Sequence, residues 1–89
     1  MTVERTVEIQ NELGMHARAA TKFVQCANRY KAECTVEKDG QEVNGKSIMG
    51  VLLLAAAKGT SIHIKCDGVD ADASLAALLE LVNAKFGES

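Results

Sequence analysis

The chain has 89 residues, of which 47% are hydrophobic and 25% are charged. These ordinary values argue against a disordered segment, and the length fits a single domain, residues 1–89, with a modest core. The formal net charge of -2 argues against a protein that binds nucleic acid through its phosphates, which normally needs a basic excess. We see neither a signal peptide nor an apolar stretch long enough to span a bilayer, so we expect a cytoplasmic protein with no membrane insertion.

The cysteines argue against a disulfide framework and against a zinc site. Cys26, Cys34 and Cys66 are odd in number, widely spaced, and lack the CxxC spacing of metal and redox motifs. We therefore expect reduced, partly buried thiols, with no metal and no cofactor.

Polarity patterns predict seven elements in the order βαββαβα. Alternating apolar and polar residues predict strands at 2–10, 32–38, 41–43 and 61–67, with a hairpin turn at Asp39 and Gly40. Apolar residues at helical spacing predict helices at 17–30, at 46–57, and from Asp70 or Asp72 to about Lys85. We therefore expect an α+β open-faced β-sandwich, in which three helices cover one face of a four-stranded sheet and water contacts the other.

The junction between the first strand and the first helix contains the strongest candidate for chemistry. His16 precedes an alanine-rich helical segment, and the first N–H groups of a helix have no intrahelical partner and attract anions. These groups belong to Ala17, Arg18 and Ala19, and the Arg18 guanidinium adds a full positive charge. No neighbouring serine, cysteine or base suggests a nucleophile pair, so the histidine itself would be the nucleophile. The alternative is that His16 only begins the helix.

A second motif stands before the second predicted helix. Ser47 is at a position typical of an N-cap, and capping alone is the simplest interpretation of it. Apolar residues near Ser47 and His16 would form a docking patch for a partner, and a phosphate on Ser47 would add about two negative charges at its edge. The predicted docking residues are Met15, Ala20, Ile48, Met49 and Leu52.

Two regions together carry a family resemblance. They are residues 14–20, with the sequence GMHARAA followed by Phe23 and Val24, and residues 46–51, with the sequence KSIMGV. Both resemble the signature regions of HPr, the histidine-containing phosphocarrier of the bacterial phosphotransferase system. The resemblance extends over essentially the whole chain and implies the HPr-like form of the open-faced sandwich.

The resemblance implies roles for three residues. His16 matches the histidine that accepts a phosphoryl group on Nδ1 from phospho-Enzyme I and passes it to a sugar-specific EIIA component. Arg18 matches the arginine that stabilises the phosphorylated and transfer states. Ser47 matches the serine that HPr kinase/phosphorylase phosphorylates in many bacteria to regulate the carrier. Such a protein is a stoichiometric carrier rather than an independent enzyme, and we expect a monomer, because it must release its partners quickly.

One position departs from the family pattern. The family usually has a proline after the arginine, whereas this chain has Ala19 and contains no proline. Proline in the first helical turn fixes φ and loses only an N–H that has no helical acceptor. We therefore expect phosphotransfer to survive, with a less preorganised anion site.

Three alternatives stay open. The chain is also compatible with a regulatory interaction module that does not serve sugar uptake, although such relatives often lack the histidine. It is compatible with a phosphocarrier of the nitrogen-linked branch, which the Gly14-Met15-His16 segment also suits. A small α+β ligand-binding domain is the third alternative, but no sequence feature requires a pocket.

Overall fold

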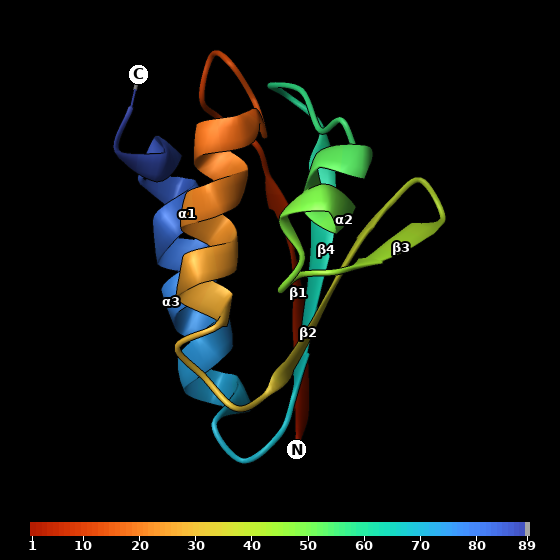
Figure 1. Ribbon diagram of the computed structural model, residues 1–89, viewed down its shortest axis with the longest axis vertical. Helices are drawn as coiled ribbons and strands as arrows, with labels where there is room; N and C mark the ends of the chain where they lie inside the picture. The colour runs from red at the N-terminus through yellow and green to blue at the C-terminus, as the bar shows by residue number, and fades with distance from the viewer. Residues whose placement is uncertain (89) are drawn as a thin grey trace.

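The computed structural model describes residues 1–88 and contains the seven expected elements in the expected order. Four antiparallel strands form one sheet with the spatial order β1-β4-β2-β3, and three helices cover one of its faces (Figure 1). The predicted α+β open-faced sandwich is therefore confirmed. The element bounds are β1 Thr2–Glu8, α1 Ala17–Ala27, β2 Glu33–Lys38, β3 Gln41–Asn44, α2 Ile48–Leu53, β4 Ser61–Asp67 and α3 Ala71–Asn83, followed by a 3-10 turn at Lys85–Gly87.

The two central strands supply a continuous apolar layer beneath the helices. In β4, Ile62, Ile64 and Cys66 are at most 1% exposed and alternate with residues that point to the open face. Val36 of β2 pairs with Ile64, and Cys34 pairs with Cys66, so the buried side chains of both strands lie on the same side of the sheet. Burial of this layer against the helices is the main driving force for the fold.

Several elements are shorter than the sequence predicted. The first strand ends two residues early and the first helix three residues early, at Glu8 and Ala27. The second helix, expected at 46–57, contains only Ile48–Leu53. Ala55 has a φ of 49°, and the carbonyl oxygen of Ala56 accepts a hydrogen bond from the N–H of Met15 at 2.8 Å. The backbone after α2 therefore leaves the helix because it contacts the loop before α1.

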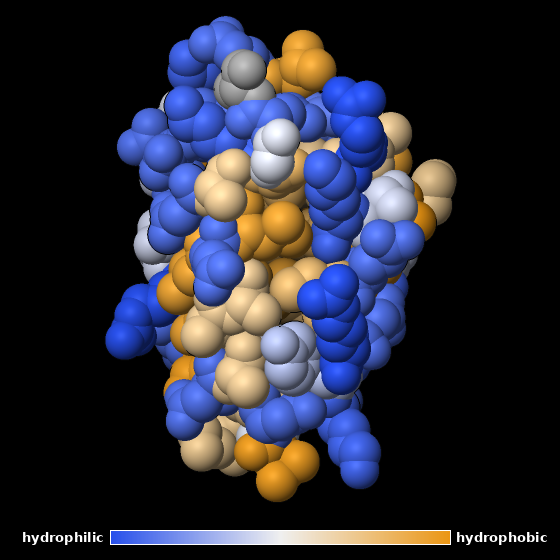
Figure 2. Space-filling view, turned by 90° about the vertical axis from the view of Figure 1, so that its left-hand side faces the viewer, coloured by the Kyte–Doolittle hydropathy of each residue, from blue (hydrophilic) through white to orange (hydrophobic). Residues whose placement is uncertain are grey.

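The helices α1 and α3 form a face that is hollowed between them. Apolar side chains are visible along this face, with charged ones beside them (Figure 2). The groove contains none of the predicted site residues. Among residues 1–88, no helix is long and apolar enough to cross a membrane. The residues that line the groove are Lys22, Gln25, Cys26, Arg29, Ala77, Glu80, Leu81 and Ala84.

Candidate functional site

His16 is the N-cap residue of α1, at the end of the molecule where this helix begins (Figure 1). Its backbone is extended, with φ -80° and ψ -179°, and its ring makes no capping hydrogen bond. The first helical hydrogen bond runs from the N–H of Ala20 to the carbonyl oxygen of His16, at 2.8 Å. The side chain is 24% exposed. Because the ring does not cap the helix, it is available for chemistry.

Close backbone contacts fix the loop that precedes His16. Gly14 has a φ of +64°, and a Cβ at this position would lie only 2.6 Å from the carbonyl oxygen of Ala56. Both facts require glycine here. The side-chain amide of Asn11 donates to the carbonyl oxygen of Gly14 at 2.7 Å, and Asn11 is fully buried. These contacts determine the direction in which the chain enters α1.

Glu88, a residue that the sequence analysis did not single out, contacts the His16 ring. Both oxygens of its carboxylate lie 3.0 Å from Nε2 of His16, and Oε2 lies 3.8 Å from Nη2 of Arg18. Asn11 Nδ2 donates to Oε1 at 2.8 Å. The hydrogen bonds from Asn11 and from His16 hold the pKa of the Glu88 carboxyl below its usual value, so the group is ionised at neutral pH.

The Glu88 contact determines which imidazole nitrogen carries a proton. An ionised carboxylate can only accept hydrogen bonds, so Nε2 of His16 must be the donor. In a neutral ring the lone pair is then on Nδ1. The geometry therefore favours Nδ1 as the nucleophilic atom.

A left-handed turn after α3 brings Glu88 to the ring. Lys85, Phe86 and Gly87 have φ values of 57°, 55° and 76°. Such a conformation costs about 1–2 kcal/mol at each non-glycine residue. The Phe86 side chain is 1% exposed, and its carbonyl oxygen accepts a hydrogen bond from Lys22 Nζ at 2.6 Å. Burial of the aromatic ring and this hydrogen bond offset the backbone strain.

The first turn of α1 supplies the other groups of the site. The N–H groups of Ala17, Arg18 and Ala19 precede that of Ala20, which makes the first helical hydrogen bond, so they point toward the helix start without a helical acceptor. The Arg18 side chain is 66% exposed and therefore has room to move toward an anion on the ring. Ala19 is fully buried. No group of three or more His, Cys, Asp or Glu within residues 1–88 is arranged to hold a metal.

Ser47 is the N-cap residue of α2. Its hydroxyl oxygen accepts a hydrogen bond from the N–H of Gly50 at 3.1 Å. This is the capping role that the sequence offered as the simplest interpretation, and the residue is partly exposed.

Two of the predicted docking residues are buried. Met15 is 5% exposed and Ala20 is fully buried. Ala20 lies on the inner face of α1 together with Phe23 and Val24, because these residues recur at helical spacing. Neither Met15 nor Ala20 can contact a partner from these positions, so this part of the prediction is wrong.

The remaining apolar residues near Ser47 are accessible to different extents. Ile48 and Met49 are 41% and 71% exposed, and Leu52 is partly buried. Leu13 and Leu53, which the sequence analysis did not single out, are 65% and 64% exposed. Leu53 follows Met49 by one helical turn in α2, a spacing that could have suggested it.

Comparisons with known proteins agree with the resemblance seen in the sequence. A family model described as "PTS HPr component phosphorylation site" matches residues 3–84. Phosphocarrier protein HPr from Neisseria meningitidis serogroup A is 50% identical over 86 residues, which are 97% of each chain. Phosphocarrier protein NPr from Shewanella violacea is 42% identical over 87 residues, which are 98% of this chain and 96% of the relative.

Solved structures share the fold. The crystal structure of HPr-C-His from Thermoanaerobacter tengcongensis superposes with a TM-score of 0.95 at 41% identity and covers 98% of each chain. A second structure from that organism, described as an HPr dimer, has a TM-score of 0.79 at 41% identity and covers 92% of this chain and 94% of the other. With the family model and the curated relatives, these matches show that the chain belongs to the HPr family of phosphocarrier proteins of the phosphotransferase system.

Proposed function

We propose that His16 accepts a phosphoryl group on Nδ1 from phospho-Enzyme I and passes it to EIIA components. The family supports a phosphoryl-carrier role in general. The observation that carries the assignment to this atom is the contact of the Glu88 carboxylate with Nε2, at 3.0 Å, which leaves the lone pair of a neutral ring on Nδ1.

In the proposed step, the Nδ1 lone pair attacks phosphorus while the bond between phosphorus and the donor breaks. The proton on Nε2 stays in place, because Glu88 accepts its hydrogen bond before and after transfer. The phosphoryl oxygens lie near the free N–H groups at the start of α1, where negative charge is favoured. Arg18 turns from Glu88 toward the phosphoryl group and adds a charge-assisted hydrogen bond. Transfer to the next carrier reverses these steps.

Ser47 is the proposed regulatory site, phosphorylated by HPr kinase/phosphorylase. Its hydroxyl lies directly before the exposed residues Ile48 and Met49, which are proposed to contact partners. A phosphate there adds about two negative charges beside an apolar surface. It also modifies the oxygen that accepts the Gly50 N–H. Docking of a partner with an acidic surface should weaken.

Incubation with phosphoenolpyruvate and Enzyme I tests the carrier role. We expect an acid-labile, base-stable phosphate that peptide mass spectrometry locates on His16. His16→Ala should accept none, whereas Ser47→Ala should accept as much as the natural protein. Phosphate on the His16→Ala variant, or an acid-stable phosphate on serine alone, would contradict the proposal.

A carrier of the nitrogen-linked branch is the second candidate, because the NPr of Shewanella violacea is 42% identical. Initial rates of His16 phosphorylation with Enzyme I of the sugar branch and with its nitrogen-branch counterpart distinguish the two. A regulatory module would instead be phosphorylated on Ser47 and transfer nothing to EIIA.

We expect a cytoplasmic monomer that releases its partners quickly. Sedimentation of the purified chain tests the monomer against the dimer known for a relative.

A further inference from the structure

Two of the three cysteines are register partners on the two central strands of the sheet. Cys34 of β2 is paired with Cys66 of β4 in the antiparallel ladder, so both side chains lie on the same side of the sheet. Residues directly opposite in such a ladder have Cα atoms about 4.5–5.5 Å apart. This separation falls within the range of about 4.4–6.8 Å that a disulfide requires. We propose that Cys34 and Cys66 form an oxidisable thiol pair, which a small peroxide converts into a disulfide between β2 and β4.

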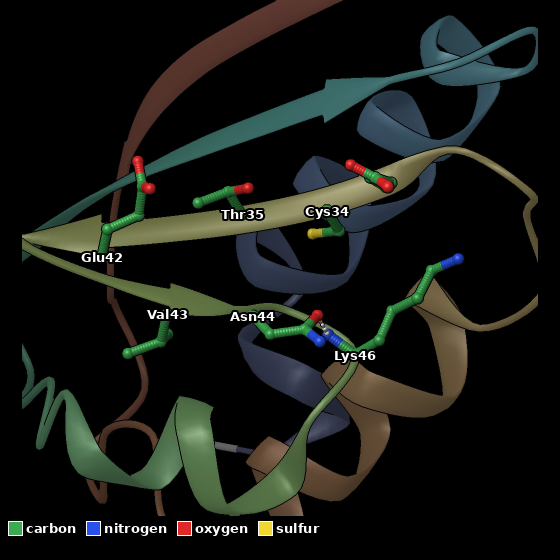
Figure 3. Close-up of a pocket in the computed structure, with 7 residues that line it drawn as sticks. Cys34, Thr35, Glu42, Val43, Asn44 and Lys46 are labelled. Atoms are coloured by element: carbon green, nitrogen blue, oxygen red, sulfur yellow. Dashed lines mark hydrogen bonds between the residues drawn. The ribbon is translucent and has the colours of Figure 1, made fainter.

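Cys34 is the less deeply buried member of the pair, at 4% exposure against 0% for Cys66. A depression of about 420 Å³ lies between β2 and β3, and Cys34 is among the residues that line it. The sulfur points from β2 into the space between the two strands, on the side of Asn44 and Lys46 (Figure 3). A Cβ at Gly45 would lie 2.3 Å from this sulfur, so the glycine provides the room that the thiol occupies. Cys66 is fully buried, so only an oxidant as small as a peroxide suits this pair.

The surroundings give the two thiols different reactivity. The neighbouring Cys34 thiol, together with Ser74 at 3.6 Å and the charge of Lys46, outweighs burial and lowers the pKa of Cys66. The neighbouring Cys66 thiol and burial raise the pKa of Cys34. Since the thiolate is the reactive form of cysteine, Cys66 is the nucleophile and Cys34 the second thiol that completes the disulfide.

The proposed reaction uses hydrogen peroxide as the oxidant. The Cys66 thiolate attacks one peroxide oxygen, the O–O bond breaks, and the departing hydroxide takes up a proton to form water. The sulfur of Cys34 then attacks the resulting sulfenic acid, the S–O bond breaks, and a second water leaves with the Cys34 proton. In sum, two thiols and one peroxide give one disulfide and two waters, so sulfur is oxidised and peroxide is reduced.

Cys26 provides an internal control. It is also buried, at 6% exposure, and burial raises the pKa of its thiol. It lies on α1, however, outside the strand ladder that aligns Cys34 with Cys66. The pair also lies far from His16, because the chain enters β2 at the end of the molecule opposite the start of α1 (Figure 1). The inference is therefore independent of the proposed phosphotransfer.

Peptide mapping of the folded chain tests the proposal. After treatment with hydrogen peroxide, the chain is unfolded, alkylated and analysed by mass spectrometry. We expect a cross-linked peptide that joins Cys34 to Cys66, an alkylated Cys26, and loss of the cross-link with dithiothreitol. The Cys26→Ser variant should form the same cross-link. The Cys34→Ser variant should stop at a sulfenic acid on Cys66, which a cyclic diketone probe captures.

Three outcomes would overturn the proposal. They are a disulfide that includes Cys26, equal oxidation of all three cysteines, and cross-linking that occurs only after the chain has been unfolded by urea. Peptide maps of the natural protein and of Cys26→Ser are sufficient for the test. A failure of Cys34→Ser to fold therefore does not affect it. Circular dichroism of each oxidised sample shows whether the cross-link formed in the folded protein.

Discussion

His16 and Ser47 are both helix N-cap residues, but their side chains are used in opposite ways. The Ser47 hydroxyl accepts the Gly50 N–H, which is the usual role of an N-cap side chain. The His16 ring makes no capping bond and instead contacts Glu88. A side-chain cap is thus present at one helix start and absent at the other, and the residue that does not cap is the one proposed to carry the chemistry.

The difference follows from how each helix is held. The longer helix, α1, has 11 residues and buries six of them, so packing exceeds the roughly 1 kcal/mol that a cap contributes. The shorter helix, α2, has six residues, of which only Val51 is buried, so its cap matters more. Packing and the contacts of the Gly14 loop stabilise the start of α1 without help from the His16 ring. Substitutions near the start of each helix test this difference between α1 and α2.

His16→Ser should have the largest effect. We expect phosphotransfer from Enzyme I to disappear, because the nucleophile is gone. The free energy of unfolding should stay the same or rise by about 0.5–1 kcal/mol, since serine can cap α1 where histidine does not. Urea unfolding and a phosphotransfer assay on the same preparation measure both. A loss of more than about 1 kcal/mol would show that the ring is needed for the fold.

Gly14→Ala should disturb the backbone contacts that stabilise the start of α1, where no side chain caps the helix. The added Cβ would lie 2.6 Å from Ala56 O at a φ of +64°, so we expect a loss of about 2 kcal/mol or more in the free energy of unfolding. Phosphotransfer should slow as His16 shifts. Gly40→Ala is the matched control, because its φ is +84° but nothing lies within 4 Å of the added atom. Equal losses in the two variants would mean that the Ala56 contact is unimportant.

Glu88→Gln should weaken the contact that orients the His16 ring while the ring itself stays in place. The amide keeps the shape of the side chain but loses the charge and one acceptor oxygen, so we expect a severalfold slower transfer and a small loss in the free energy of unfolding. Nitrogen NMR of His16 should show a smaller fraction of the tautomer with the proton on Nε2. Glu12→Gln is the control, since Glu12 pairs with Lys58 at 2.6 Å and is not among the ring's contacts. An unchanged tautomer in Glu88→Gln would remove Glu88 from the site.

The same contact should depend on pH with a definite sign. Because the folded chain lowers the pKa of Glu88 below its usual 4.5, ionised Glu88 favours the folded arrangement. The contribution is complete above about pH 4.5 and is lost as the pH falls through the lowered pKa. Chemical shifts of the His16 ring should change as the pH falls from about 4.5 through the lowered pKa of Glu88, because the protonated carboxyl no longer holds Nε2. The Glu88→Gln variant should not show this change.

Ser47→Ala should affect stability and leave phosphotransfer unchanged. Loss of the bond to Gly50 removes the cap of α2, which should cost about 1 kcal/mol in the free energy of unfolding. Ser47→Asp, which can also cap, should recover most of that loss while weakening partner docking through its charge. Slower phosphorylation of His16 in Ser47→Ala would show that the start of α2 affects the start of α1, which the comparison does not predict.

Ala19→Pro should have the smallest effect. Ala19 occupies the first turn of α1 and is fully buried. A proline there fixes φ and should raise the free energy of unfolding by about 0.5 kcal/mol if its ring fits the core. We expect active transfer in both forms, measured as the initial rate with Enzyme I. A natural protein that transfers nothing and is rescued by proline would contradict this.

The sequence was sufficient for the fold because each element has a clear period. The alternation in β4 and the helical spacing in α3 both agree with the burial that the structure shows. The end of α2 was missed because its continuation is apolar and helix-like, whereas the backbone at Ala55 turns to contact the Gly14 loop. Local propensity contains no information about such a contact between distant loops.

The candidate site was predictable only where it is local in sequence. His16, Arg18 and Ser47 lie in short motifs, and their functional roles stay predictions. Glu88 was invisible because it lies 72 positions from His16 and belongs to no motif near it. Met15 was assigned to a surface because it precedes His16, but position along the chain does not determine which side of a loop faces the core.

The left-handed turn at Lys85–Gly87 makes the proposed reactive ring a reporter of complete folding. A chain in which α1 has formed but α3 has not docked contains His16 and its helix start, yet lacks the carboxylate that holds Nε2. Its imidazole exchanges freely between tautomers and rotamers. Docking of α3, with Phe86 buried, brings this carboxylate to the ring. Within the proposed mechanism, we therefore expect a chain whose α3 has not docked to be phosphorylated more slowly than the folded protein.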